Sequence, residues 1–396
     1  MRAVTARTDY DFFSTEVRAD PFPLFRRLRE NDPVYRSDFG YWYVSTYADA
    51  SRLVRDTRLG AGKGVPDSLG LSSGRLYDVM TAWMMALDGA DHARVRRLIS
   101  RAFTPRAVES LRLPIQALTD RLLDDLAARG SVEIVADFAF PIPMEVVRLL
   151  FGADASEWDK HVVELVRPGS RAAANVVEMM DALADYLLDV VARRRDAPGT
   201  DMFSAMVVPD DDGDRLSDHQ LLANAVLLVT AGFETSMSLI ALSILTLLRH
   251  PDQRRALRAD PALVRNAVEE VLRFEPAALS TTRGALEDVE LRGEVIPAGS
   301  NILFPMAAIN RDPDRYPDPD TFDIARPDIR PLTFGGGVHV CLGAALARLE
   351  AEIAVGSFFG RFANARLSDD EIEWQAQNPT VRRPVALHVD LGEASQ

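Results

Sequence analysis

The stretch Phe334-Gly335-Gly336-Gly337-Val338-His339-Val340-Cys341-Leu342-Gly343 decides the fold of this chain. It holds Cys341, the only cysteine among 396 residues, and it stands just before an apolar helical pattern that begins at Ala344. A single thiol cannot form an intramolecular disulfide. It cannot build a multi-cysteine zinc or iron-sulfur site either, because such ligands come in sets of two to four.

Three roles remain for Cys341: an inert core thiol, a reactive nucleophile, or the single axial ligand of a haem iron. Three consecutive glycines are costly to order, and they allow backbone N–H groups to approach a sulfur closely. The helix that follows presents its positive N-terminal end, which favours a thiolate over a thiol. These surroundings argue against the inert thiol and leave the other two roles open.

The pattern Phe-Gly-x-Gly-x-His-x-Cys-x-Gly, followed by Ala345-Leu346-Ala347-Arg348, resembles the haem-binding loop of the cytochromes P450, the haem-thiolate monooxygenases. The resemblance implies that Cys341 is the metal ligand, binding the iron of haem b as a thiolate. Such a ligand pushes electron density onto the iron and favours O–O cleavage. The resemblance also implies that His339 contacts a haem propionate and that the loop holds the cofactor through Phe334, Gly335 and Gly343.

A second motif, Ala231-Gly232-Phe233-Glu234-Thr235, lies inside an apolar helical run. A helical glycine costs about 1 kcal/mol relative to alanine, and a carboxylate among apolar residues is costly unless it is paired or functional. Taken alone, the motif also fits a local kink with a satisfied buried glutamate. It resembles the family's oxygen-activation motif, which implies a widened helix with a groove for dioxygen at Ala231 and Gly232. Thr235 then contacts the bound oxygen, and Glu234 helps to deliver protons.

The third motif, Glu270-Val271-Leu272-Arg273, places a carboxylate and a guanidinium three residues apart on one helix face. Taken alone, such a pair is usually solvated and of little energetic value. It resembles the family's Glu-x-x-Arg motif, in which an arginine from a later irregular segment, here Arg326, completes a structural triad. The resemblance implies that this triad holds the underside of the cysteine loop.

Further residues are assigned to the haem propionates by the same resemblance. His92 and Arg96 are four residues apart in the segment 88–97, so they project from one helix face. Arg283, expected just ahead of a strand, adds another donor to His339. Haem carries two carboxylates, and three or four such groups can hold them bidentately.

Helical periodicity dominates the chain, and the predicted fold is mainly α with small β-sheets, a cytochrome P450 fold. Helices are predicted at 21–30, 47–55, 92–103, 105–129, 143–151, 176–195, 217–249, 251–259, 262–274 and 344–359. Strands are predicted at 34–35, 41–45, 289–291, 300–304 and 384–389, and 307–331 is predicted to be irregular. No linker or internal repeat divides the chain, so we expect a single large helical domain over residues 1–396.

Composition and charge exclude several classes of protein. The chain has 26% charged and 47% hydrophobic residues, as ordinary globular proteins do, and its net charge of −14 argues against nucleic acid. The first residues lack the apolar core of a signal peptide, so a cytoplasmic location is predicted. The run 221–248 carries one formal charge, Glu234, and matches a membrane span by hydropathy. Its polar residues and the capping box Ser217-x-x-Gln220 favour a buried helix without membrane insertion.

The implied function is NAD(P)H-driven monooxygenation of a lipophilic small molecule by O2, through hydroxylation or epoxidation. No flavin or iron-sulfur module is attached, so we expect a separate ferredoxin-type electron donor and its reductase. Six arginines against one acid in 92–112 form either a docking patch for that donor or a salt-laced helix face. We expect a monomer that acts in bacterial secondary metabolism, such as antibiotic biosynthesis. Substrate contacts are expected in 166–177 and at Met84, Leu227, Ala231, Ala278, Leu279 and Val381.

Two rival functions make different predictions. A class I terpene cyclase could use the run Asp210-Asp211-Asp212-Gly213-Asp214 to bind magnesium and diphosphate, but it leaves the cysteine loop unexplained. A haem-thiolate gas or redox sensor explains Cys341, but it has little need for the acid and alcohol pair Glu234-Thr235.

Overall fold

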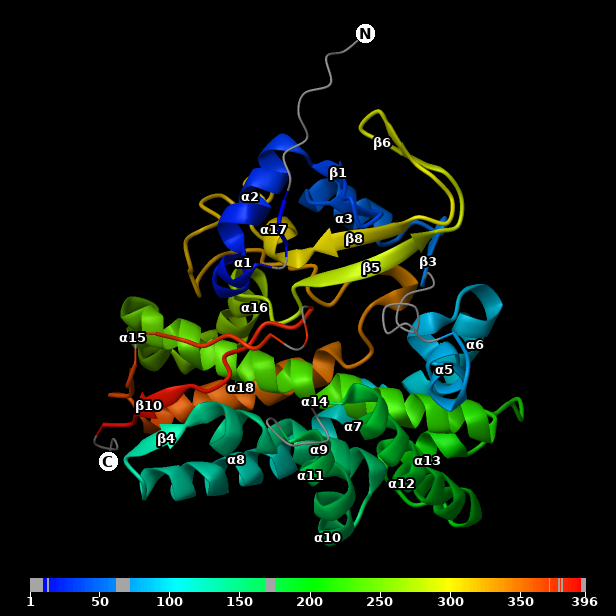
Figure 1. The fold of residues 1–396 in the computed structure, drawn as a ribbon. Coiled ribbons are helices and arrows are strands. Elements are labelled where there is room, and N and C mark those ends of the chain that lie inside the picture. Colours follow the sequence, from blue (N-terminus) through cyan, green and yellow to red (C-terminus); the bar gives the residue numbers. More distant parts are fainter. Residues whose placement is uncertain are drawn as a thin grey trace.

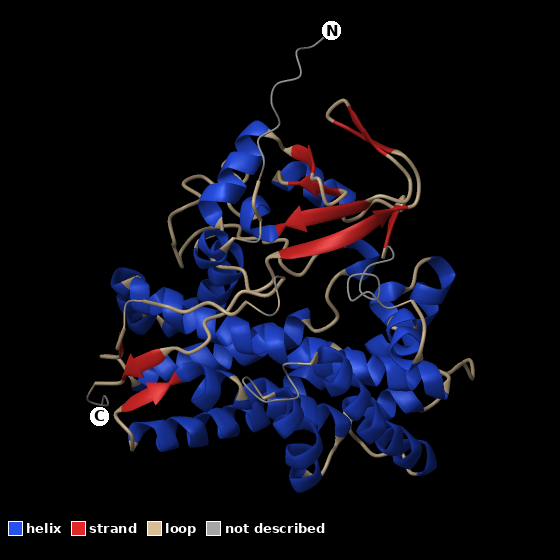
Figure 2. Ribbon diagram, in the orientation of Figure 1, coloured by secondary structure: helices blue, strands red, loops and turns tan. Residues whose placement is uncertain are grey.

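The computed structural model describes residues 10–12, 14–61, 72–167, 175–369, 371–376, 378 and 380–392. Most helices gather in one part of the molecule, and the largest sheet lies at one side of them (Figure 1). Figure 2 shows how small the sheets are beside the helical part, which confirms the predicted mainly α architecture.

The predicted helices all form, with ends that differ from the prediction by a few residues. They are α2 (Phe22–Asn31), α3 (Tyr47–Leu53), α6 (Gly89–Ser100), α7 (Pro105–Ser110), α8 (Arg112–Ala127), α9 (Pro141–Phe151), α12 (Val176–Asp196), α14 (Asp218–Arg249), α15 (Pro251–Ala259), α16 (Val264–Phe274) and α18 (Ala344–Arg361). The prediction of one helix over 105–129 was wrong, because α7 and α8 divide it. Pro114 has no N–H to donate to the carbonyl of Ser110, and proline is favoured in a first helical turn.

Most of the shorter helices were not predicted, because fewer than about two turns show no clear apolar period, although residues 101–103 and 262–263 fell inside predicted helices. They are α1 (Thr15–Ala19), α5 (Arg75–Thr81), α10 (Ala155–Trp158), α11 (Glu164–Val166), α13 (Met202–Val207) and α17 (Met306–Ile309). The single turns are η1 (Met84–Ala86), η2 (Arg101–Phe103), η3 (Val135–Ala139), η4 (Asp159–Val163), η5 (Pro261–Leu263) and η6 (Gly337–His339).

Helix α14 runs through the middle of the helical part, where α9, α12, α16 and α18 pack against it (Figure 1). It begins with the predicted capping box, in which Ser217 and Gln220 cap each other's backbone N–H groups. The helix is long and apolar enough to cross a membrane, yet 67% of its apolar window is buried inside the protein. Burial on several sides explains why its sequence is apolar on several faces.

The largest sheet has the strand order β1-β2-β8-β5-β3. Its strands are β1 (Val34–Arg36), β2 (Tyr41–Val44), β3 (Leu59–Gly60), β5 (Ser280–Ala285) and β8 (Asn301–Pro305). Strands β2 and β8 are parallel, with Trp42 opposite Ile302, and the other pairs are antiparallel. The prediction that Arg283 precedes a strand was wrong, because it lies within β5. The β-branched Thr281 and Thr282 favour that extended conformation.

Two smaller sheets complete the fold. One joins β4 (Ser131–Glu133), β9 (Arg366–Leu367) and β10 (His388–Asp390), and the other is the hairpin of β6 (Val289–Leu291) and β7 (Glu294–Ile296). The strand predicted at 384–389 is shorter than expected, because Pro384 makes only an isolated bridge to Trp374. The segment predicted to be irregular, 307–331, begins inside α17, and its remainder from 310 to 331 has no regular element.

Candidate active site

The cysteine loop is a tight structure that only glycine permits at two positions. Gly335 and Gly337 have φ angles of +70° and +67°, in the left-handed region that favours glycine. A Cβ atom at Gly337 would lie 2.5 Å from the carbonyl oxygen of Val54, which follows α3. The backbone N–H of Cys341 donates to the carbonyl of Phe334 at 2.9 Å. The loop is therefore held against the end of α3 and closed on itself.

The Cys341 side chain is solvent-accessible although protein atoms surround it densely, so it faces a space within the protein. Burial raises the pKa of the thiol, whereas a hydrogen bond from the Gly343 N–H and the charges of Arg96 and Arg348 lower it. The N–H bond to sulfur agrees with the haem-loop prediction. A metal cation beside the sulfur adds the positive charge that stabilises its thiolate.

The four predicted propionate ligands come together around this loop from α6, β5 and the loop itself. The rings of His92 and His339 lie 4.2 Å apart, and Arg96 donates to the carbonyl of Val340 at 2.8 Å. Arg283 is 7% exposed, and its Nη1 donates to the carbonyl of Thr282 at 2.8 Å. These four side chains, distant along the chain, therefore lie close together, and their role as propionate ligands stays a prediction.

Burial lowers the pKa values of His92 and Arg283 in this group of four side chains. Burial and then the charges of His339 and Arg96 lower the pKa of His92 to about 4. Its Nε2 atom is buried and has no hydrogen-bond partner among the residues that the structure describes. Burial also lowers the pKa of Arg283. An orphaned donor among several cationic groups fits a cofactor that brings two carboxylates.

Asp88 is a member of this site that the sequence analysis did not assign. Its carboxylate lies 3.2 Å from Nε2 of His339 and accepts the N–H of Ala61 at 2.8 Å. It therefore orients His339 from the first residue before α6. Its place four residues before His92 was visible in the sequence, but nothing there showed that His339 comes within reach.

The oxygen-activation motif lies in the middle of α14. The side chain of Ala231 is exposed although most of the helix is buried, so this face borders an accessible space. Thr235 donates from Oγ1 to the carbonyl of Ala231 at 3.0 Å, and Glu234 accepts from Nδ2 of Asn378 at 3.0 Å. The predicted widening of the helix is not seen as a change of helix type, because α14 stays α-helical across the motif. The Thr235 bond is of the kind that bends helices locally.

A buried acid behind this motif was also missed. Glu350 of α18 is 2% exposed and shares a hydrogen bond with Ser236, the residue after Thr235. Burial raises the pKa of Glu350 to about 8, and within the described chain its Oε2 has no partner. The sequence could have indicated its burial, because Glu350 falls four residues after Leu346 and three before Ile353, on the apolar face of the helix.

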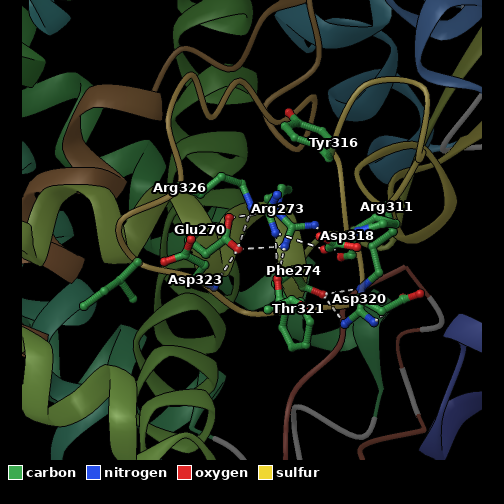
Figure 3. A network of polar contacts seen from close by, with 12 residues as sticks. Glu270, Arg273, Phe274, Arg311, Tyr316, Asp318, Asp320, Thr321, Asp323 and Arg326 are labelled. Carbon is green, nitrogen blue, oxygen red and sulfur yellow. Dashed lines mark hydrogen bonds and ion pairs between the residues drawn. The ribbon is translucent and has the colours of Figure 1, made fainter.

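The Glu-x-x-Arg motif forms the predicted triad (Figure 3). Glu270 and Arg273 have no exposed side-chain surface, and Arg273 donates to Glu270 from Nε and Nη2 at 2.7 Å each. Arg326 adds a bond from Nε at 3.2 Å. Arg273 also donates to the carbonyls of Pro319 and Thr321 at 2.7 and 3.0 Å. The solvated-pair interpretation is wrong, because this pair fastens α16 to the irregular segment.

The triad reaches the cysteine loop through neighbours of that segment. Asn310 donates to Thr333 at 2.8 Å and accepts the N–H of Leu332 at 2.8 Å. Thr333 in turn donates to the carbonyl of Leu272 at 2.6 Å. Leu332 and Thr333 stand directly before Phe334, so the start of the loop is tied to α16.

The predicted substrate contacts fall into two groups. Met84 and Leu227 are buried in one apolar cluster that also contains Val95. Ala278 bridges to Val381, and the Leu279 N–H donates to the carbonyl of Thr380 at 2.8 Å. Residues 168–174 of the expected region 166–177 lie outside the described part of the chain.

The positive region at 92–112 is largely engaged within the protein. Arg94 and Arg97 form ion pairs with Asp214, and Arg97 also pairs with Asp210. Arg112 pairs with Glu109. These contacts support the interpretation of 92–112 as a helix face with several ion pairs. They also engage Asp210 and Asp214, two of the aspartates that a terpene cyclase would need to bind magnesium.

Comparison with known proteins decides the family. The sequence profile described as Cytochrome P450 matches residues 165–386, more than half of the chain. The chain belongs to the cytochrome P450 family. Cytochrome P450 107B1 of Saccharopolyspora erythraea is 39% identical over 385 residues, covering 92% of this P450 and 93% of the relative. The 6-deoxyerythronolide B hydroxylase of the same organism is 37% identical, covering 92% and 95%.

A solved structure agrees with this assignment. The bacillaene polyketide synthase P450 PksS of Bacillus subtilis superposes on this P450 with a TM-score of 0.88 at 31% identity, over 96% of this chain and 99% of that one. The fold is therefore that of a cytochrome P450, the protein is a monooxygenase, and its cofactor is haem b. Small-molecule substrates and O2 are the reactants of the family.

Proposed function

We propose that this P450 hydroxylates or epoxidises a lipophilic small molecule in bacterial secondary metabolism. The observation that carries the proposal is the meeting of His92, Arg96, Arg283 and His339 around the loop that bears Cys341. The relatives named above support the substrate class, since one is a 6-deoxyerythronolide B hydroxylase and another belongs to polyketide synthesis. Apolar residues at Met84 and Leu227 offer hydrophobic contact rather than charge recognition.

In this proposal, His92, Arg96, Arg283 and His339 hold the haem propionates, and Asp88 orients His339. Cys341 holds the iron, in a loop that Gly335, Gly343 and Phe334 shape. The bound haem supplies oxygen binding and the oxidising power to attack carbon. The triad of Glu270, Arg273 and Arg326 keeps the loop in register.

The protein's own contribution to oxygen chemistry is the delivery of protons. Thr235 presents a hydroxyl beside Ala231 and Gly232, and Glu234 lies one residue away, held by Asn378. Glu350 is neutral at pH 7, because its pKa is about 8, and it shares a hydrogen bond with Ser236. The carboxyl groups of Glu234 and Glu350, behind one hydroxyl, can hold and replace the protons that oxygen reduction consumes.

The wider setting is part of the same proposal. Electrons come from NAD(P)H through a separate ferredoxin and reductase, the chain acts as a cytoplasmic monomer, and residues 1–396 form one domain. Because Arg94, Arg97 and Arg112 form ion pairs within the protein, docking of the ferredoxin at 92–112 depends on other arginines, such as the exposed Arg106. Antibiotic biosynthesis is the proposed pathway class, and the similarity to the P450 of a polyketide synthase supports it.

The test is a spectral titration of the purified haem protein. The reduced carbonyl complex should absorb at about 450 nm, the band for which the family is named, and Cys341→Ala should abolish it. Macrolactones, fatty acids and steroids are then titrated, with sugars as hydrophilic controls, and products are examined for one added oxygen atom. An intact band in Cys341→Ala, or spectral changes with the sugars alone, contradicts the proposal.

A further inference from the structure

Asn224 is a fully buried amide in the apolar part of α14. Its Oδ1 accepts the backbone N–H of Met84 at 2.8 Å, and its Nδ2 donates to the carbonyl of Ala82 at 3.3 Å. A further bond from Nδ2 reaches the carbonyl of Gln220 at 2.8 Å, one turn earlier in α14. The side chain thus joins the connection between α5 and η1 to the central helix.

Helix geometry places this clamp near the oxygen-activation motif. Asn224 stands seven residues before Ala231 and eleven before Thr235. At 3.6 residues per turn these spacings are about two and three turns, so the three residues share one face of α14. The rise of about 1.5 Å per residue puts Asn224 roughly 10 Å along the axis from Ala231. The clamp therefore lies on the same face of α14 as the motif, about two turns before it.

The clamped segment brings an apolar residue, Met84, next to α14. Met84 is 7% exposed and belongs to the same apolar cluster as Leu227, which is three residues after Asn224. Burying an amide here is costly unless its hydrogen bonds are made, and all three of its bonds serve to place backbone. A leucine of similar size would fill the same apolar volume without holding the segment.

We propose that Asn224 is a positioning residue for substrate binding, which fixes the segment from Ala82 to Met84 as one wall of the substrate space. This inference rests on the proposed function, because it presumes that the space beside α14 receives a lipophilic substrate. Ala82 and Gln220, on the two sides of the clamp, also line a surface cleft of about 610 Å³. Releasing the clamp frees this wall and opens the substrate space toward that cleft.

The first experiment compares Asn224→Leu with a matched control, Ser243→Ala. Ser243 is 1% exposed on the same helix, and its hydroxyl donates to the carbonyl of Leu239 in that helix. Imidazole and 1-dodecylimidazole are titrated into each haem protein, and the Soret shift reports their affinities. Both probes bind iron, but only the long alkyl chain samples the walls.

The expected result is a loss of affinity for the long-chain probe and not for imidazole. Asn224→Leu should weaken binding of 1-dodecylimidazole at least about fivefold, as the loss of a net hydrogen bond predicts, and imidazole binding by less than about twofold. Ser243→Ala should change neither affinity. Unchanged dodecyl affinity, or equal weakening of both probes, overturns the proposal. The band at about 450 nm in the unmodified protein reports separately on the proposed haem-thiolate function.

A second measurement needs no variant. In hydrogen exchange of the unmodified haem protein, the Met84 amide should be protected, because its N–H is buried and bonded to Asn224. Exchange of that amide at the rate of an unstructured peptide overturns the clamp, even if Asn224→Leu fails to fold.

Discussion

Replacing Arg273 by leucine tests whether the Glu-x-x-Arg triad supports the fold. The substitution leaves Glu270 with Arg326 and the N–H of Asp323 as its remaining partners. It also removes the Arg273 donors from three carbonyls, those of Asn310, Pro319 and Thr321. The Thr321 carbonyl keeps its bond from Nη2 of Arg326 at 2.9 Å, so two carbonyls lose their described donor, at a cost of about 2 kcal/mol if each costs about 1 kcal/mol. Breaking a buried ion pair typically costs about 3–5 kcal/mol, so we expect a loss in that range.

The chain offers a matched control with the same spacing. Arg112 pairs with Glu109 three residues earlier, but these side chains are 40% and 61% exposed. Arg112→Leu should therefore change the free energy of unfolding by less than about 1 kcal/mol. Urea unfolding of both haem proteins, followed by circular dichroism, gives the two differences from their midpoints and slopes. Equal effects of the two substitutions would refute the claim that burial makes the Glu270 pair structural.

Three further predictions follow from the site. The pKa of Glu350 is about 8 in the folded protein, against 4.5 ordinarily. Between these pH values the unfolded chain binds fewer protons than the folded protein, so stability falls as pH rises. Glu350→Gln removes this pH-dependent loss of stability. The unfolding free energy of the variant minus that of the unmodified protein should rise from about pH 5 to about pH 7.5, by at most about 1.4 kcal/mol per pH unit. A difference that stays constant with pH contradicts the assigned pKa of Glu350. Glu234→Gln should retain the hydrogen bond from Asn378 but lose the transferable proton. Turnover should fall at least about 10²-fold, while the 450 nm band of the reduced carbonyl complex stays unchanged. Normal turnover of this variant would show that Glu234 does not deliver protons. Gly337→Ala should reduce haem retention on gel filtration, because the new Cβ would clash with the Val54 carbonyl and the backbone φ is +67°. The control Gly360→Ala should keep its haem, because a Cβ there meets nothing within 4 Å. Equal haem retention in the two variants would show that the loop can move away from α3.

The sequence predicted the features that short motifs encode. The helix 217–249 was predicted closely because its apolar run and capping box are local. The haem-loop, oxygen and Glu-x-x-Arg motifs each lie on the expected element. Arg283 was placed wrongly, because the strand tendency of the two threonines before it was overlooked.

The features that the sequence could not predict depend on contacts between distant segments. The pairs Glu270–Arg273 and Glu109–Arg112 have the same spacing, and only the covering segment makes the first one buried. Asn224 reads as one polar residue in an apolar helix, because its partners lie about 140 residues earlier. Glu350 was missed for a related reason, since its partner Ser236 belongs to another helix.

The parallel pairing of β2 with β8 has a consequence for biosynthesis. Roughly 260 residues separate the two strands, and ribosomes add roughly 5–20 residues per second, so β2 waits roughly 13–50 s for its partner to be made. During that time the β1–β2 hairpin has an open edge that presents unpaired backbone groups. Trp42, Tyr43 and Val44 are then available to chaperones or to other nascent chains. Yield in a heterologous host should therefore depend on translation speed and on chaperone supply.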